Sequence, residues 1–97
     1  MIYNIIWSPK AKDTYYQILE YLESNWLDRE VSDFINRTEE VLSFITANPS
    51  QYIKSIKADI HKCVLVKQVS LFYRIKPGAI ELLLFWDNRQ DPTKLKF

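Results

Sequence analysis

Apolar and polar residues alternate most regularly in the last third of the chain. Three apolar runs between residues 62 and 87 are separated by turn signals, a pattern typical of an antiparallel β-meander. The clearer turn is Lys76-Pro77-Gly78-Ala79, in which proline presets φ at position i+1 and glycine accepts a positive φ at position i+2. The other turn is expected around Lys67-Gln68. The sequence therefore predicts three consecutive antiparallel strands.

Successive strand side chains point to opposite faces, so the alternation also predicts which residues share a face. In the middle run, one face carries Val69, Leu71, Tyr73 and Ile75, and the other carries Ser70, Phe72, Arg74 and Lys76. In the last run, one face is expected to carry Ile80, Leu82, Leu84 and Trp86, opposite Glu81, Leu83, Phe85 and Asp87. One face of the sheet is then wholly apolar and covered, and the other is mixed, basic and partly wet.

The first half of the chain has helical periodicity instead. Ser8 is a good N-cap and Pro9 suits the first helical position, so a helix is predicted over residues 9–26, where apolar residues recur at helical spacing. A second amphipathic helix is predicted from Asp28 to the Asn48-Pro49 step, because the residue before proline is pushed out of the α region. The short break between the two helices forces them into an antiparallel hairpin.

These elements combine into an α+β fold. A short strand over residues 1–7 precedes the hairpin, and residues 50–61 connect the hairpin to the meander. The apolar face of the meander is the surface on which the two apolar helix stripes can be buried. We expect the order β-α-α-β-β-β, a helical hairpin packed on one face of a small antiparallel sheet, in a single domain spanning residues 1–97.

The composition of the chain is that of an ordinary globular protein. Its 97 residues are 47% hydrophobic and 26% charged, and no apolar run approaches the roughly 20 residues that span a membrane. A single cysteine cannot form an internal disulfide, and the start of the chain is unlike a signal peptide, so a cytoplasmic protein is expected.

The net charge of +1 conceals an asymmetry between the two halves. Residues 1–50 carry four Lys/Arg against eight Asp/Glu, whereas residues 51–97 carry nine against four. Two interpretations remain open: a solvated acidic surface on the helices, or a basic sheet surface for an anionic partner.

No strong catalytic, metal-binding or cofactor motif is present. A single glycine excludes the dinucleotide fingerprint and the P-loop, and neither a metal nor a cofactor is expected. Cys63 is expected to be a small buried residue. His61 is expected at the surface, although an imidazole also suits proton transfer near neutral pH. Arg74 can pair with Glu81 across the hairpin, or bind a carboxylate or phosphate.

The polar stretch after the last apolar run is the main candidate site. It reads Trp86-Asp87-Asn88-Arg89-Gln90-Asp91-Pro92. In one interpretation it is a capped loop, in which Asp87 and Asn88 make local turns and Arg89 binds a carboxylate of this chain. In the other, Arg89 is a fork for an external phosphate or carboxylate.

The order of several local strings resembles a known family. The chain is similar to the RelE/ParE superfamily of bacterial toxins from type II toxin–antitoxin modules, which are also described as plasmid stabilisation proteins. The family fold is a helical hairpin on a small antiparallel sheet. The strings that carry the resemblance span nearly the whole chain: Ser8-Pro9-Lys10-Ala11, Ile18-Leu19-Glu20-Tyr21, Ala47-Asn48-Pro49, His61-Lys62-Cys63, Leu71-Phe72-Tyr73-Arg74-Ile75, and Asp87 to Pro92.

The resemblance implies two alternative activities. ParE-like members inhibit DNA gyrase by binding, whereas RelE-like members cleave mRNA on the ribosome with Lys, Arg and a Tyr or His. The chain fits the ParE-like group better, because Ser70 stands where RelE-like enzymes place an arginine and no Tyr or His follows Trp86. Its low net charge also suits an RNA-rich target poorly. If the protein were a ribonuclease, the catalytic candidates would be Lys54, Lys57, His61 and Arg89. A degenerate toxin or plain interaction domain is the third hypothesis.

Either activity implies a cognate antitoxin and a hetero-oligomer with it. The residues expected to bind the antitoxin or the target are Lys62, Phe72, Arg74, Leu83, Phe85 and Arg89. The apolar members are expected to be exposed on the open sheet face, since such a patch usually has a partner. Alternatively, the neighbours of the first strand or the last residues, Leu95 and Phe97, cover them.

Overall fold

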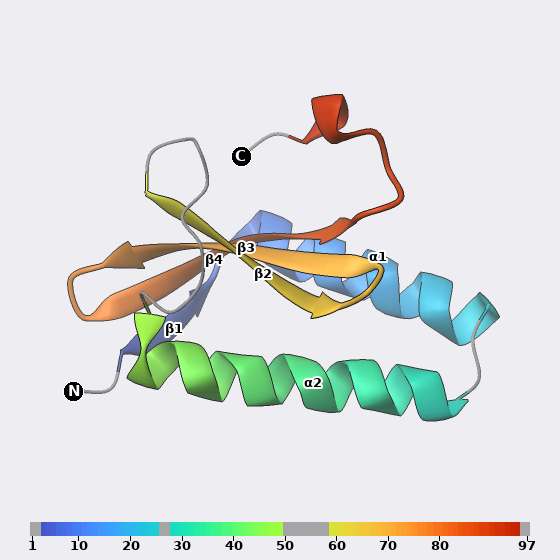
Figure 1. The fold of residues 1–97 in the computed structure, drawn as a ribbon, viewed down its shortest axis with the longest axis horizontal. Coiled ribbons are helices and arrows are strands. Elements are labelled where there is room, and N and C mark those ends of the chain that lie inside the picture. Colours follow the sequence, from blue (N-terminus) through green and yellow to red (C-terminus); the bar gives the residue numbers. More distant parts are fainter. Residues whose placement is uncertain (1–2, 26–27, 50–58, 96–97) are drawn as a thin grey trace.

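The computed structural model describes residues 3–25, 28–49 and 59–95. The order of the elements is β-α-α-β-β-β, which confirms the predicted α+β fold (Figure 1). Neither described helix is long and apolar enough to cross a membrane. The elements are β1 (Asn4–Trp7), α1 (Pro9–Asn25), α2 (Asp28–Ala47), β2 (Ile60–Val66), β3 (Val69–Lys76), β4 (Ala79–Asp87) and the short 3-10 helix η2 (Pro92–Lys94).

The four strands form one sheet in the order β1-β4-β3-β2. Strands β2, β3 and β4 make the predicted antiparallel meander, but β1 lies parallel to β4, with Trp7 opposite Leu82. The sheet is therefore mixed and not wholly antiparallel. A parallel pair needs a long connection between its strands, and here the helical hairpin and the meander together provide it.

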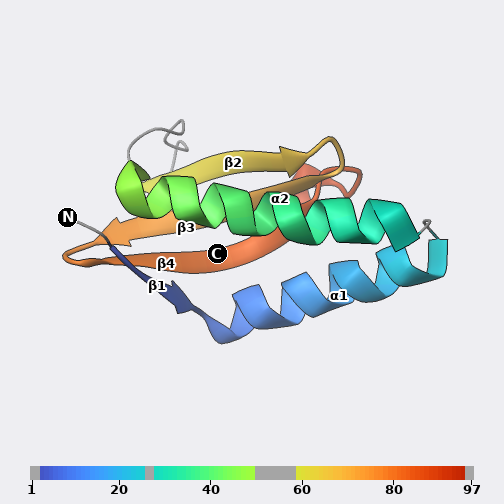
Figure 2. The same ribbon diagram turned by 90° about the horizontal axis from the view of Figure 1, so that it is seen from below.

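The two helices pack on one face of the sheet (Figure 2). Helix α1 starts as predicted, because the Ala11 backbone N–H donates to Ser8 Oγ over 3.0 Å. The Ser8 hydroxyl itself donates to the Leu83 carbonyl over 3.0 Å, which ties the start of α1 to β4. Helix α2 returns antiparallel to α1 and is amphipathic as predicted, with Phe34, Thr38, Val41 and Ile45 buried.

The main core lies between the hairpin and the sheet. At its centre is an aromatic cluster drawn from four elements, in which the rings of Trp7 and Phe85 stack with centroids 5.5 Å apart. The Tyr15 ring lies 5.0 Å from Phe85 and 5.8 Å from Phe34. Cys63 is fully buried in the same core, as expected. Large rings thus fill the core of a domain whose radius of gyration is only 13.1 Å.

A β-bulge in β4 changes which of its residues face the helices. Phe72 pairs with Leu84 and Tyr73 pairs with Leu82, so Leu83 is the extra residue of the bulge. Beyond it the alternation shifts by one position: Phe85 joins the main core, while Leu84 and Trp86 lie on the opposite face. The predicted faces of these three residues were therefore wrong, because strict alternation does not continue through a bulge.

The other face of the sheet carries a smaller apolar cluster. Ile60, Phe72 and Leu84 are buried there, and Leu95 packs against them. Leu95 belongs to the C-terminal segment (residues 88–95), which runs past the sheet on the side away from α2 (Figure 1). Leu95 thus supports the alternative in which the end of the chain covers these apolar residues; Phe97 lies outside the described residues.

Candidate functional site

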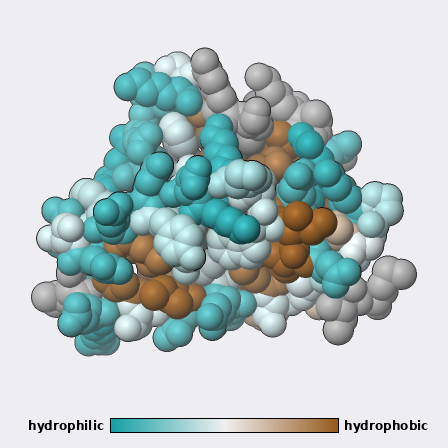
Figure 3. All heavy atoms as spheres, turned by 180° about the vertical axis from the view of Figure 1, so that it is seen from behind, coloured by the Kyte–Doolittle hydropathy of each residue, from teal (hydrophilic) through white to brown (hydrophobic). Residues whose placement is uncertain are grey.

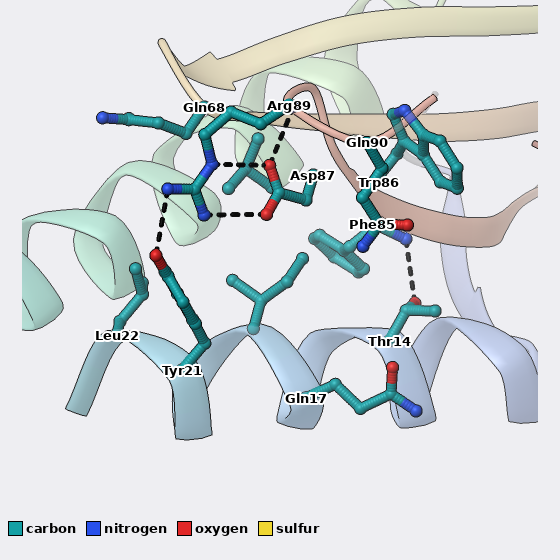
Figure 4. Close-up of a pocket in the computed structure, with 12 residues that line it drawn as sticks. Thr14, Gln17, Tyr21, Leu22, Gln68, Phe85, Trp86, Asp87, Arg89 and Gln90 are labelled. Carbon is teal, nitrogen blue, oxygen red and sulfur yellow. Dashed lines mark hydrogen bonds and ion pairs between the residues drawn. The ribbon is translucent and has the colours of Figure 1, made fainter. Parts of the chain in front are cut away.

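A groove of about 280 Å³ separates α1 from the C-terminal end of β4 (Figure 4). One wall is a stripe of α1 that includes Gln17 and Tyr21. The other wall is the end of β4 with the residues that follow it, notably Asp87 and Arg89, and Gln68 from the β2–β3 turn. The polar stretch singled out in the sequence thus forms one wall of a real concavity.

The groove exists because β1 is shorter than β4. Strand β1 pairs with β4 only as far as Leu82, so beyond the bulge the edge of β4 faces α1 instead of another strand. The Phe85 backbone N–H donates to Thr14 Oγ1 over 2.9 Å and closes one end. At the other end, Arg89 Nη1 donates to the Tyr21 hydroxyl over 3.0 Å. Seven residues of α1, about 10 Å of helix, separate these two contacts.

Arg89 is held by Asp87, the last residue of β4. Its Nε and Nη2 donate to the two carboxylate oxygens of Asp87 over 3.0 and 2.8 Å, a bidentate pair. The Arg89 backbone N–H donates to Asp87 Oδ1 as well, over 2.9 Å. The guanidinium carbon also lies 4.8 Å from the centre of the Tyr21 ring. Arg89 therefore binds a carboxylate of its own chain, as the capped-loop interpretation predicts.

This pairing perturbs the titration of both groups. The hydrogen bonds from Arg89 lower the pKa of the Asp87 carboxyl, against a smaller opposing effect of burial. In turn, the hydrogen bonds to Asp87 and then to Tyr21 raise the pKa of Arg89. Both groups are consequently ionised at neutral pH, and the pair is neutral as a whole.

Asn88 lies in a local turn and also anchors the loop to residues distant in the sequence. Its backbone N–H donates to the Gln68 carbonyl over 2.7 Å, and its Oδ1 accepts from the Ser70 hydroxyl over 2.9 Å. The Gln90 backbone N–H also donates to the Asp87 carbonyl over 3.0 Å and closes a turn with Asn88 and Arg89 at its centre, as the capped-loop interpretation predicts. Further along, the Thr93 backbone N–H donates to Asp91 and lowers its pKa.

Of the four ribonuclease candidates, the structure describes His61 and Arg89, and these two lie apart. Lys54 and Lys57 lie outside the described residues. His61 was expected at the surface but is 6% exposed and stacks on Tyr73, with ring centroids 5.1 Å apart. The register causes this burial, since His61 pairs with Tyr73 and shares its helix-facing side. The register also places His61 and Arg89 at opposite ends of the sheet.

The predicted binding residues are divided between the two faces. Phe72 and Phe85 were expected to be exposed, and both are buried: Phe72 in the smaller cluster, Phe85 in the main core. Leu83 is half-buried beside the smaller cluster, and Lys62 is exposed. Arg74 lies 3.8 Å from the Glu81 carboxylate, the cross-strand pair that the sequence suggested.

Sequence reasoning did not assign a role to Tyr21 or Thr14. Thr14 contacts β4 and Tyr21 contacts Arg89 just beyond it, although Tyr21 entered the sequence analysis only as part of a string that carries the resemblance. The available signal for Tyr21 was its position off the apolar stripe of α1, since an exposed aromatic residue on a helix often has a polar contact for its hydroxyl.

Among the described residues, no group of three or more His, Cys, Asp or Glu side chains is placed to hold a metal ion.

Exposed apolar side chains on the described part of the surface come from several elements. They are Ile6, Tyr16, Tyr21, Phe44 and Val64, each at least 41% exposed. Figure 3, which views the molecule from the α1 side, shows separate apolar patches with hydrophilic side chains between them. This side therefore offers small apolar surfaces that are set apart from one another.

Comparisons with known proteins identify the fold. No protein-family model and no curated protein matches the sequence. Among solved structures, a chain of the chromosomal ParDE TA system from P. aeruginosa superposes with a TM-score of 0.73 at 15% identity, covering 89% of this chain and 96% of that one. The YoeB/ParE toxin from Agrobacterium tumefaciens gives 0.63 at 11% identity, with 87% and 96% covered.

A third structure is the heterotetrameric complex of the YoeB-YefM toxin-antitoxin from Staphylococcus aureus. It gives a TM-score of 0.56 at 19% identity, with 87% of this chain and 94% of that one covered. All three similarities span nearly the full described architecture, and the resemblance noticed in the sequence is confirmed at the level of fold. This protein has the fold of the YoeB/ParE toxins.

Proposed function

We propose that this protein is the toxin of a type II toxin–antitoxin pair, that it arrests growth by binding DNA gyrase in the cytoplasm, and that a cognate antitoxin neutralises it as a hetero-oligomer. The toxin assignment rests on the fold, which this chain shares with the ParDE and YoeB structures over at least 87% of its length. The partnership with an antitoxin rests on the YoeB-YefM toxin-antitoxin complex, because a chain of that complex has the same fold as this protein.

The pairing of Arg89 with Asp87 favours gyrase binding over mRNA cleavage as the activity of this protein. A catalytic arginine must offer its charge to a phosphate in the transition state, but here the Asp87 carboxylate already takes up two of its donors. His61 is buried on the helix side and lies far along the sheet from Arg89. This arrangement supports a protein that acts through its surface.

Induced expression in bacteria that lack the antitoxin tests the proposal. We expect growth arrest with altered plasmid supercoiling and intact mRNA, both measured in the same culture. Rapid mRNA cleavage with normal supercoiling would contradict gyrase binding and support the RelE-like ribonuclease activity. Continued growth with soluble, folded protein present would reject the toxin assignment in favour of a degenerate toxin or an interaction domain.

A purified system then separates contact residues from catalytic ones. We expect the protein to inhibit the supercoiling reaction of purified gyrase, and alanine at Lys54, Lys57 or Arg89 to weaken inhibition only in part. The Arg29→Ala variant is the matched control, because Arg29 is an exposed arginine on α2, away from the groove. Complete loss of toxicity with any single variant that still folds would contradict a surface-binding mechanism.

Genetic rescue identifies the antitoxin. Genomic fragments that restore growth under induction are expected to encode a protein that co-purifies with this chain in a defined ratio. A fragment could also restore growth by repressing expression of the toxin gene. Such a fragment would encode no protein that co-purifies with this chain, and rescue by fragments of this kind alone would contradict the proposed antitoxin partnership.

A further inference from the structure

The groove between α1 and the end of β4 presents hydrogen-bonding groups that this chain leaves unused. Gln17, Gln68 and Gln90 all line it, and no hydrogen bond among the described residues involves their side-chain amides. Arg89 has five N–H donors, of which contacts with Asp87 and Tyr21 occupy three. Amides on both walls and two guanidinium donors are thus available to a ligand.

The floor of the groove is apolar. Leu22, Val69 and Phe85 lie there almost fully buried, and Ile18, which also lines the groove, is half-buried. A volume of about 280 Å³ accommodates one large side chain with a little backbone. Extended chain advances about 3.3 Å per residue, so the roughly 10 Å between the two end contacts accommodates three residues.

The charges of the lining cancel. Asp87 and Arg89 form its one acid–base pair, and they neutralise each other. A phosphate or carboxylate that approached Arg89 would also meet the Asp87 charge, so it would gain little net attraction. A neutral carbonyl accepts hydrogen bonds from the same donors without that repulsion, and primary amides match both groups of a peptide bond.

We propose that this groove binds an extended, uncharged polypeptide segment of the antitoxin, with one apolar side chain inserted between the Thr14–Phe85 and Tyr21–Arg89 contacts. Figure 4 shows these two contacts, with Gln17 on the α1 side and Gln90 on the opposite side. The source of the segment rests on the proposed function; its chemistry rests on the groove alone.

Synthetic peptides test the chemistry without the antitoxin. Acetylated and amidated hexapeptides of Ser and Asn, with a central Leu, are titrated into the ¹⁵N-labelled full chain by NMR. We expect the side-chain amide signals of Gln17, Gln68 and Gln90 to shift, and the affinity to change little with salt. Tighter binding of a central-Glu peptide or of inorganic phosphate would overturn the neutral-ligand proposal, as would shifts confined to another face.

Paired variants test the role of the amides. The Gln17→Ala, Gln90→Ala double variant removes two exposed amides and leaves the floor intact, so the Leu peptide should bind about tenfold more weakly, from two lost hydrogen bonds. The Asn36→Ala variant is the control, because Asn36 is an exposed amide on α2 outside the groove. Equal affinities for the double variant and the control would overturn the proposal.

Peptides that tile the antitoxin, once it is identified by growth rescue, test the source. We expect one uncharged segment to shift the three glutamine signals and to lose about tenfold in affinity with the double variant. If no antitoxin peptide shifts the three glutamine signals, the claim that the bound segment comes from the antitoxin is wrong. If induced protein causes no growth arrest, the proposed function fails, and the synthetic-peptide titration still reports on the groove separately.

Discussion

At the scale of single residues, Asp87 links the end of β4 to the loop beyond it. Its carboxylate accepts from the backbone N–H, Nε and Nη2 of Arg89, and Arg89 in turn reaches Tyr21 on α1. The charge on Asp87 is therefore part of the connection between helix and sheet. The lowered pKa of Asp87 makes this contribution dependent on pH.

The first prediction concerns the Asp87→Asn variant. Since the folded-state pKa of Asp87 lies below its ordinary value of 3.8, the ionised carboxylate stabilises the fold fully above that pH. The contribution is lost as the pH falls through the folded-state pKa. Urea denaturation should thus show a less stable variant at pH 7 and a narrower difference from the natural protein near pH 3.

A matched control is Asp33→Asn, which replaces an exposed carboxylate on α2 outside this contact. Its stability difference from the natural protein should stay small at pH 7. A difference for Asp87→Asn that stayed constant between the two pH values would show that the charge of Asp87 is not what holds the loop.

At the scale of elements, the edge of β4 beyond β1 shows how a helix can replace a missing strand. Ser8 accepts at the helix start and donates to Leu83, and Thr14 accepts from the Phe85 N–H one and a half turns later. Two small hydroxyl side chains thereby satisfy backbone groups of a strand edge that would otherwise need water or a partner. Because α1 takes the place of a strand here, the groove between α1 and the end of β4 stays open beyond the Thr14–Phe85 contact.

The Thr14→Val variant tests this edge contact. Valine keeps the shape of threonine but cannot accept, so the Phe85 N–H is left without its partner at a cost of about 1–2 kcal/mol in the free energy of unfolding. Thr46→Val is the control, because Thr46 is only half-buried and its hydroxyl, among the described residues, bonds within its own helix to the Ser43 carbonyl. Equal urea midpoints for the two variants would contradict the role given to Thr14.

The β3–β4 turn gives a second prediction at this scale. Gly78 has a φ of +69°, as the turn predicted from Pro77-Gly78 requires, and no atom lies within 4 Å of the position that a Cβ would take there. Gly78→Ala should therefore cost about 1–2 kcal/mol through backbone strain alone, and Gly78→Asn less, because asparagine tolerates this region. Thermal or urea denaturation that ranked Asn below Ala would refute the strain argument.

At the scale of the whole molecule, the two faces of the sheet differ in what covers them. The hairpin buries one face under a large aromatic core, whereas Leu95 of the C-terminal segment packs on the smaller cluster of the other. The described hydrogen bonds of residues 91–95 stay within that segment. Truncation of a core side chain should thus lower the free energy of unfolding more than truncation of Leu95, which covers the smaller cluster.

Phe85→Ala and Leu95→Ala measure this difference. Phe85 is 2% exposed, stacks with Trp7 and contacts the Tyr15 ring at a tilt, so its removal should cost about 3–5 kcal/mol, a large part of the stability of a small domain. Leu95 is only half-buried, and its removal should cost about 1 kcal/mol. A stable Phe85→Ala protein with weakened antitoxin binding would instead restore the surface role first expected for Phe85.

The sequence by itself determined the order of the elements, the cap at Ser8, the β3–β4 turn and the buried stripe of α2. Each depends on residues close together in the chain, where backbone preferences and periodicity act directly. The sequence also identified Asp87 to Gln90 as the polar end of the last strand.

Only the tertiary structure decided the bulge at Leu83, the burial of His61 and Phe85, and the groove beside Arg89. A bulge is fixed by pairing between strands, and its one-residue shift exchanges the two faces of everything that follows. The contacts of Arg89 with Tyr21, 68 residues away, and of Thr14 with Phe85, 71 residues away, depend on how the hairpin lies on the sheet. Periodicity reports which face of an element is apolar, but the register between elements determines what that face meets.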